Sequence, residues 1–72
     1  MDGYQTLANA VVAQAAKDYR EALRRLREHP DSPAAEQTRR ECESFFRSAW
    51  YGMLTDINPE YIIRRIREEE AE

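Results

Sequence analysis

Apolar residues recur every three or four positions along most of this chain, which is the spacing of amphipathic helices. The spacing predicts three helices, at about residues 6–28, 33–54 and 59–69, separated by turns that contain proline. No stretch alternates apolar and polar residues with the period of a strand. The pattern therefore predicts an all-α, three-helix module: an antiparallel two-helix hairpin plus a short third helix, in a single domain over residues 1–72.

The predicted first helix carries one broad apolar face. This face consists of Leu7, Ala8, Val11, Val12, Ala15, Ala16, Tyr19, Ala22, Leu23 and Leu26. Thr6, just before the face begins, is the expected N-cap residue. The face is rich in alanine and wider than one neighbouring helix covers. It therefore motivates a homodimer hypothesis, in which surplus apolar surface is buried across a two-fold axis.

A basic stripe lines one flank of that face and consists of Lys17, Arg20, Arg24 and Arg27. Cations clustered on one face of a helix can bind the phosphates of a nucleic acid. The chain as a whole is acidic, however, with a net charge of −3. A solvated face, whose apolar stems cover the edge of the core, is the simpler interpretation.

The second predicted helix begins with Ser32 as the N-cap residue and Pro33 at the first helical position, where an N–H would have no helical partner. The buried face of this helix collects several aromatic residues. That face consists of Ala35, Thr38, Cys42, Phe45, Phe46, Ala49, Trp50 and Met53. We therefore expect Trp50 to pack against the first helix near Tyr19 and Leu23.

The third predicted helix starts with Asn58 as the N-cap residue and Pro59 at the first helical position. Its apolar stripe is short and consists of Ile62, Ile63 and Ile66. The acidic sequence EEEAE closes the helix. Negative charge at a helix C-terminus opposes the helix dipole, so we expect this end to fray.

The candidate protein-interaction residues are Tyr51, Arg47 and Leu54. On the second predicted helix, Tyr51 lies off the core face and beside Arg47. Tyrosine and arginine together on an exposed face are typical of binding hot spots. The alternative is that the third helix folds back and covers Tyr51 together with Leu54, and the sequence leaves both possibilities open.

The composition favours a folded domain, because 42% of the 72 residues are hydrophobic and 35% are charged. The single cysteine, Cys42, excludes an internal disulfide and suits a reducing compartment. No apolar run approaches the roughly 20 residues of a membrane span, and the start at Met1 lacks the pattern of a signal peptide. We therefore expect a cytoplasmic protein of a bacterial cell.

The sequence contains no constellation that predicts catalysis, a cofactor site or a metal site. His29 and Cys42 together fall short of the three or four ligands of a zinc site. Cys42 lies beside Phe45 and Phe46, which favours a buried and inert thiol over a nucleophile. We therefore expect a protein that is not an enzyme and takes no small-molecule substrate.

Two segments, LANAVVAQAAKDYREALRRL and ECESFFRSAWYGMLTDINPEYIIRRIREE, resemble small helical proteins encoded in phages and prophages of Gram-positive gut bacteria. The resemblance covers nearly the whole chain and is most specific from Cys42 to Thr55, where it follows the pattern ECExFFRSxWYxxLT. The turn HPDSPAA departs from it, since a more basic stretch is usual there. The resemblance implies a phage context and supplies no active site.

Phage-encoded proteins of this size often act by binding a host protein, including components of host defence. The expected function is therefore a non-enzymatic protein-interaction module, in the form of an inhibitor of a host system. Its partner is a host protein or a second copy of the chain. The alternative is a small nucleic-acid-binding protein that uses the basic stripe. A partner captured from a host lysate, as a discrete protein or as nuclease-sensitive material, would distinguish the two.

Overall fold

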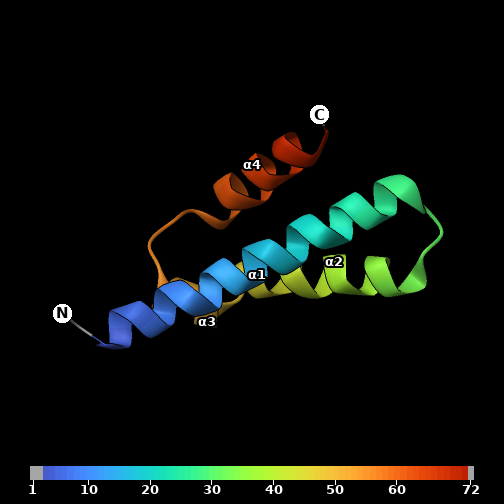
Figure 1. The fold of residues 1–72 in the computed structure, drawn as a ribbon. Coiled ribbons are helices and arrows are strands. Elements are labelled where there is room, and N and C mark those ends of the chain that lie inside the picture. The colour runs from blue at the N-terminus through green and yellow to red at the C-terminus, as the bar shows by residue number, and fades with distance from the viewer. Residues whose placement is uncertain (1–2, 72) are drawn as a thin grey trace.

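The chain folds into helices alone within the residues that the structure describes. The computed structural model describes residues 3–71, with side chains described from Leu7 to Ala71. In chain order the helices are α1 (Gly3–Glu28), α2 (Pro33–Phe46), α3 (Ala49–Leu54) and α4 (Pro59–Ala71) (Figure 1). The predicted all-α class is confirmed, and α1 and α2 form the predicted antiparallel hairpin.

The helix starts follow local capping chemistry. Ser32 caps α2 as predicted, since its Oγ accepts a hydrogen bond from the N–H of Ala35 at 3.2 Å. Asn58 does the same for α4, where its Oδ1 accepts from the N–H of Glu60 at 2.8 Å. The prediction of Thr6 as an N-cap is wrong, because α1 already begins at Gly3. No residue between these two positions strongly disfavours a helix.

The second predicted helix is broken, and this is the main difference from the sequence prediction. α2 ends at Phe46, and Ser48 starts α3 with an extended backbone, at φ −82° and ψ 158°. The Ser48 hydroxyl donates to the carbonyl of Phe45 at 2.6 Å and accepts from the N–H of Tyr51 at 3.2 Å. Serine side chains compete with helical hydrogen bonds in this way, so Ser48 ends one helix and caps the next.

The break reverses which residues of α3 face the core. In an unbroken helix, Trp50 and Met53 would share the inward face of Phe46, because they follow it by four and seven positions. In the structure Tyr51 is buried, at 1% exposed, whereas Trp50 is 56% and Met53 74% exposed. The prediction that Trp50 packs against α1 is therefore wrong, because it assumed an unbroken helix.

The core is centred on three aromatic rings, one from each helix of α1, α2 and α3. Tyr19, Phe46 and Tyr51 are each at most 1% exposed. The ring of Phe46 meets the edges of the other two, with centroids 5.7 Å from Tyr19 and 5.6 Å from Tyr51. Ile63 and Ile66 of α4 complete the cluster. Edge-to-face pairs of this kind add to the free energy of burial.

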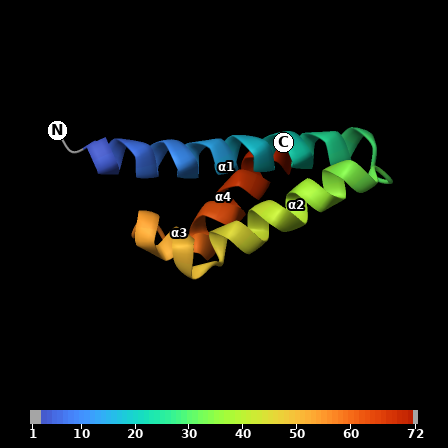
Figure 2. The same cartoon turned by 90° about the horizontal axis from the view of Figure 1, so that it is seen from below.

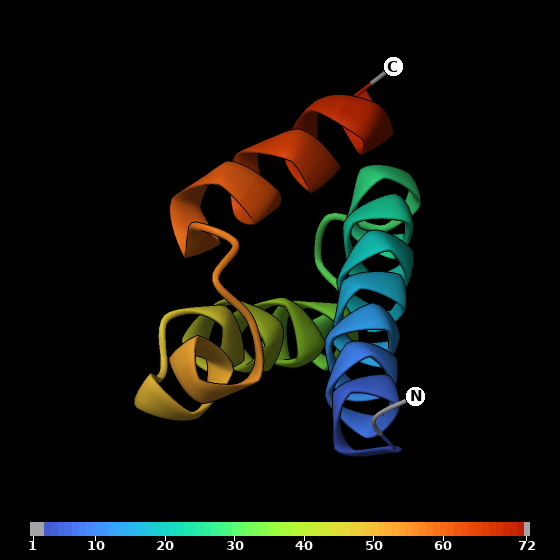
Figure 3. The same cartoon turned by 90° about the vertical axis from the view of Figure 1, so that its left-hand side faces the viewer.

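Helix α4 crosses the hairpin, and its C-terminal end lies toward α1 (Figures 2 and 3). The predicted fraying of this end is not seen, since α4 stays helical through Ala71. The reason is electrostatic. Glu69 and Glu70 pair with arginines of α1, at 3.1 Å to Arg20 and 3.2 Å to Arg24, and these contacts offset the unfavourable helix dipole.

The broad apolar face of α1 is wide because more than one helix packs on it. α2, α3 and α4 all contact α1. Ala16, Tyr19 and Ala22 are buried there, whereas Leu7 near the start of the helix remains 63% exposed. This packing accounts for most of the apolar width that motivated the homodimer hypothesis. Dimerisation stays a prediction, but the width of the α1 face no longer supports it.

Candidate functional site

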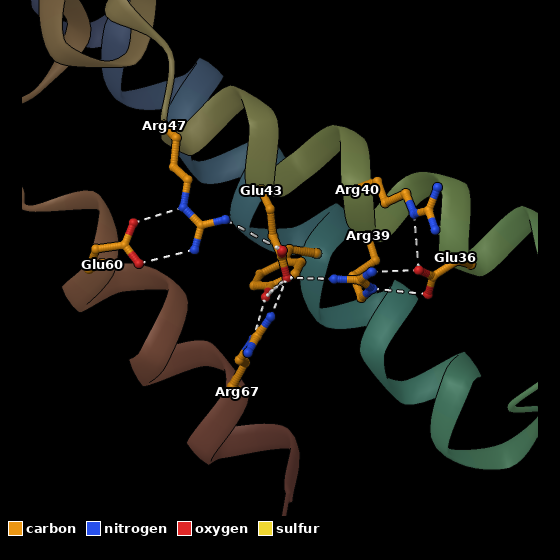
Figure 4. Close-up of polar contacts among 8 residues, drawn as sticks. Glu36, Arg39, Arg40, Glu43, Arg47, Glu60 and Arg67 are labelled. Atoms are coloured by element: carbon orange, nitrogen blue, oxygen red, sulfur yellow. Dashed lines mark hydrogen bonds and ion pairs between the residues drawn. The ribbon is translucent and has the colours of Figure 1, made fainter.

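A buried carboxylate lies where α1, α2 and α4 meet. Glu43 of α2 is 8% exposed, and its Oε2 accepts hydrogen bonds from the Tyr19 hydroxyl and from Arg67 Nη2, each at 2.6 Å. Arg67 Nε donates in turn to the Tyr19 oxygen at 2.9 Å. Arg39 adds another donor to Glu43 Oε2 at 3.1 Å (Figure 4). We call these four residues the polar junction.

The polar junction shifts the protonation of its members in opposite directions. Burial is the largest single effect and raises the pKa of Glu43. The hydrogen bonds from Tyr19, Arg67 and Arg39, together with the charge of Arg67, outweigh it in sum, so the net pKa lies below its ordinary value. Burial and the hydrogen bond to Glu43 raise the pKa of Tyr19 to about 12. Glu43 is therefore ionised and Tyr19 neutral at neutral pH, and each stabilises the other's state.

This arrangement is suited to holding helices together. A general acid or base needs a pKa near the working pH and access to a substrate, whereas the Tyr19 side chain is fully buried and its pKa is raised away from neutrality. No group of three or more possible metal ligands occurs among the described residues. The polar junction thus links α4 to the hairpin.

A second set of ion pairs extends from the junction along α2. Arg39 and Arg40 both contact Glu36, and the hydrogen bonds from Arg39 are the largest of the effects that lower the pKa of Glu36 to about 2. At the other end, Arg47 makes a two-pronged contact to Glu60 of α4, at 2.8 and 3.0 Å (Figure 4). Arg47 therefore fastens the N-terminal end of α4 to α2.

The structure separates the three residues predicted to form a protein-interaction site. Tyr51 is buried in the aromatic core, so the exposed alternative is wrong and it is no accessible anchor. Arg47 is exposed but is held by Glu60 and lies 3.7 Å from Glu43. Leu54, the last residue of α3, is half-buried. Because α2 ends before Tyr51, the expected side-by-side placement of Tyr51 and Arg47 does not form.

The basic stripe faces an acidic counterpart. Arg20 pairs with Glu69, Arg24 pairs with Glu70, and Arg27 donates to the main-chain carbonyl of Glu70. Only Lys17 of the stripe has no such contact with the end of α4 among the described residues, and it is exposed. The stripe is therefore largely matched by the acidic C-terminal turn, which reduces the positive field that a phosphate backbone would meet.

The cysteine and the histidine remain apart from any site. Cys42 is buried, as predicted, and burial together with the negative charges of Asp18 and Glu41 raises the pKa of its thiol to about 11. A thiol with so high a pKa is a poor nucleophile at neutral pH. His29 lies in the exposed turn between α1 and α2.

The most unusual surface of the molecule is apolar. Trp50 and Met53 lie one turn apart on the outer side of α3, and Ile57, in the loop after it, is 48% exposed. Met53 and Ile57 line the same shallow hollow. We call Trp50, Met53 and Ile57 the α3 surface. Large apolar side chains exposed together commonly mark a binding site.

A shallow groove extends this surface toward α2. It is lined by Arg40, Glu41, Ser44, Phe45, Ser48 and Trp50. The indole of Trp50 stands edge-on to the ring of Phe45, with centroids 5.5 Å apart and an interplanar angle of 81°. Phe45 and Trp50 together give this shallow groove an aromatic lining.

The sequence analysis predicted neither the buried position of Glu43 nor the exposed α3 surface. A signal for Glu43 existed, since Tyr19 was expected on a buried face and a buried hydroxyl needs a partner. The spacing of Glu43 from Arg39 and Arg47 also matches helical ion pairs. The α3 surface had only Ser48 as a signal. Serine is tolerated within many helices, so the break was hard to anticipate.

Comparison of the chain with protein-family models, with curated proteins and with solved structures finds no match. The resemblance to phage-encoded helical proteins accordingly stays a prediction. Over the described residues, no helix combines the length and apolar character that crossing a membrane requires. Function must therefore be inferred from the surfaces of the molecule itself.

Proposed function

We propose that the protein is a non-enzymatic protein-interaction module that binds its partner through the α3 surface. The observation that carries this proposal is the joint exposure of Trp50, Met53 and Ile57 in a domain whose core is small. Tryptophan is among the residues most enriched in binding hot spots, and its contribution is largest when it is rigid before binding. Trp50 already makes an edge-on contact with the ring of Phe45, which favours one orientation of the indole.

The local sequence supports a functional reason for this exposure. The capping hydrogen bonds of Ser48 turn Tyr51 inward and leave Trp50 outside. An exposed indole contributes little to folding, and it increases the risk of aggregation. A partner that covers Trp50 would account for its position. The resemblance noted in the sequence suggests a host protein as that partner, although the proposal does not depend on it.

The nucleic-acid alternative has less support. The arginines of the basic stripe are engaged by Glu69 and Glu70, and binding a polyanion would require those contacts to be exchanged. The ion-paired stripe is therefore better explained as the docking site of α4.

The experiment that tests the proposal is a capture assay from a lysate of a Gram-positive gut bacterium. The wild-type chain is compared with the double variant Trp50→Ser, Met53→Ser and with a control, Arg20→Gln, Arg24→Gln. We expect a discrete protein to be retained by the wild type and the control but lost from the double variant. Helical content measured by circular dichroism verifies that each variant is folded. Retention by the double variant, or capture of nuclease-sensitive material that the control abolishes, would contradict the proposal.

A further inference from the structure

The kind of partner can be narrowed from the shape and charge around the α3 surface, and this step rests on the proposed function. The groove between α2 and α3 is shallow and open, and Ser44, Phe45 and Trp50 are among the residues that line it. Such a groove accepts one row of apolar side chains, which is how a single helix docks on a protein surface.

The main chain of the partner also favours a helix. An extended peptide usually binds by adding a strand to an exposed sheet edge, where its N–H and C=O groups find partners. The described chain has no strand and so offers no such edge. A helix satisfies its own main-chain hydrogen bonds along its length and needs only side-chain contacts from the groove.

The charges beside the α3 surface are acidic. Glu41 lines the groove and Asp56 lines the hollow beside Met53, and both are exposed. The nearby cations are already engaged: Arg40 contacts Glu36 at 3.2 Å, and Arg47 contacts Glu60. Two acidic side chains, Glu41 and Asp56, and one basic side chain, Arg40, line the two hollows, so their summed charge is negative. This excess favours a partner with lysine or arginine beside its apolar row.

We infer that the α3 surface binds an amphipathic helix of another protein, with an apolar face flanked by basic residues. A second copy of this chain fits less well. Two copies meeting through the α3 surface would each bring two carboxylates, Glu41 and Asp56, against one guanidinium, Arg40, and an excess of like charge disfavours binding. A stable dimer also commonly uses about 20–30 residues from each subunit, whereas a helix can dock with a few anchors.

The test uses a synthetic helical peptide of about 15 residues, the length at which isolated helices become marginally stable. Leucine occupies positions i, i+3, i+4 and i+7, and lysine fills the rest. One control peptide replaces each lysine with glutamate, and another keeps the composition but scrambles the leucine spacing. Trp50 is the only tryptophan of the chain, so its emission reports directly on occupation of the surface.

We expect the leucine–lysine peptide to shift the emission of Trp50 to shorter wavelength. The glutamate version and the scrambled peptide should each bind on the order of tenfold more weakly, a difference of about 1.4 kcal/mol. In the variant Glu41→Gln, Asp56→Asn, the preference for lysine over glutamate should shrink. Anisotropy of a labelled peptide should show that Met53→Ser weakens binding. Circular dichroism should show that this variant keeps its helical content.

Other outcomes overturn the inference in distinguishable ways. Equal binding of the lysine and glutamate peptides would contradict the basic partner. Equal binding of the scrambled peptide would contradict the helix. A shift in emission that depends on protein concentration alone, together with a dimer in sedimentation, would assign the surface to a second copy. In each case a capture assay that still depends on Trp50 and Met53 would leave the proposed function standing, whereas capture independent of them would remove both.

Discussion

Trp50 and Tyr51 are adjacent in the chain, yet they belong to two regions that differ in almost every respect. Tyr51 belongs to a core in which aromatic rings from α1, α2 and α3 meet edge to face. Trp50 belongs to the α3 surface, where it touches Phe45 on one side and is otherwise more than half exposed. Apolar contacts and the polar junction shield the core from solvent, whereas the α3 surface is exposed to it.

The comparison shows that the break between α2 and α3 separates the regions that the two side chains join. Ser48 caps α3 at this break, and Tyr51 lies inward after it. The region that stabilises the fold and the region proposed to bind a partner thus meet at the same break. Substitutions in the two regions should have very different effects on stability.

The largest expected effect is at Tyr51. Tyr51→Ala should lower the free energy of unfolding by about 3–5 kcal/mol, because it leaves a cavity in the core. Trp50→Ala should lower it by less than about 1 kcal/mol, since the indole is largely on the surface. Urea unfolding followed by circular dichroism measures both. The reverse order would mean that Trp50, and not Tyr51, belongs to the core.

Tyr51→Phe provides a matched control for that measurement. The hydroxyl of Tyr51 is buried and has no hydrogen-bond partner among the described residues, and an unpaired buried hydroxyl is unfavourable. We expect the phenylalanine variant to be at least as stable as the wild type. A clear loss of stability would indicate that the hydroxyl does form a bond in solution.

The next effect concerns the polar junction. Glu43→Ala should lower the free energy of unfolding by about 2–3 kcal/mol, because it removes charge-assisted hydrogen bonds from a buried position and leaves the Tyr19 hydroxyl without its acceptor. Arg67 is half exposed and can turn to water, which limits the loss. A double-mutant cycle of Glu43→Ala with Arg67→Ala should give a clear coupling energy. Additive effects would show that the pair contributes nothing jointly.

Acidification should lower the free energy of unfolding, because it protonates carboxylates whose pKa is lowered in the folded state. The pKa values of Glu36, Glu43 and Glu60 all lie below the ordinary value of 4.5, and that of Glu36 is about 2. Their contribution is present above pH 4.5 and is lost as the pH falls toward 2. Unfolding free energies measured between pH 6 and pH 2 should decline below about 4.5. In Glu43→Gln this decline should be smaller, and stability that rises on acidification would contradict the account.

Alkaline conditions should weaken the fold for the opposite reason. The pKa of Cys42 is raised to about 11 and that of Tyr19 to about 12. A raised pKa means that the folded state holds the proton, so this stabilisation is present below the ordinary values and is lost as the pH rises through the shifted ones. In a pH titration followed by tyrosinate absorbance, Tyr19 should ionise at a higher pH in the folded protein than in the unfolded chain.

The smallest effect is expected at the end of α4. Glu69→Gln with Glu70→Gln should lower the free energy of unfolding by about 0.5–1 kcal/mol at low salt, since these ion pairs are partly exposed. The loss should shrink as salt screens the charges. A loss that is independent of salt would indicate packing in place of ion pairing.

Local signals in the sequence predicted the hairpin and its caps well. Ser32 and Asn58 precede a proline and stand between apolar periodic segments, so capping chemistry identifies them without tertiary information. Ser48 precedes no proline, and the same residue type is common inside helices. Whether Ser48 breaks the helix depends on how Tyr51 packs against α1 and α2, which the sequence pattern does not contain.

The polar junction could not be predicted from the sequence for a related reason. Glu43 and Arg67 are 24 positions apart, and Tyr19 is another 24 positions from Glu43. Their meeting depends on the crossing of α4 over the hairpin. The acidic end of α4 shows the same limit, because a rule for an isolated helix predicts fraying, whereas the arginines of α1 offset it.

The most direct test of the account is the accessibility of Trp50 in the folded protein. Acrylamide quenching of the single tryptophan should proceed at a rate near that of the urea-unfolded chain, and the emission maximum should lie close to the unfolded value, because the indole is 56% exposed. The measurement belongs at low protein concentration, so that self-association does not cover the surface. A blue-shifted and quencher-protected Trp50 in the monomer would contradict the break at Ser48 and, with it, the α3 surface.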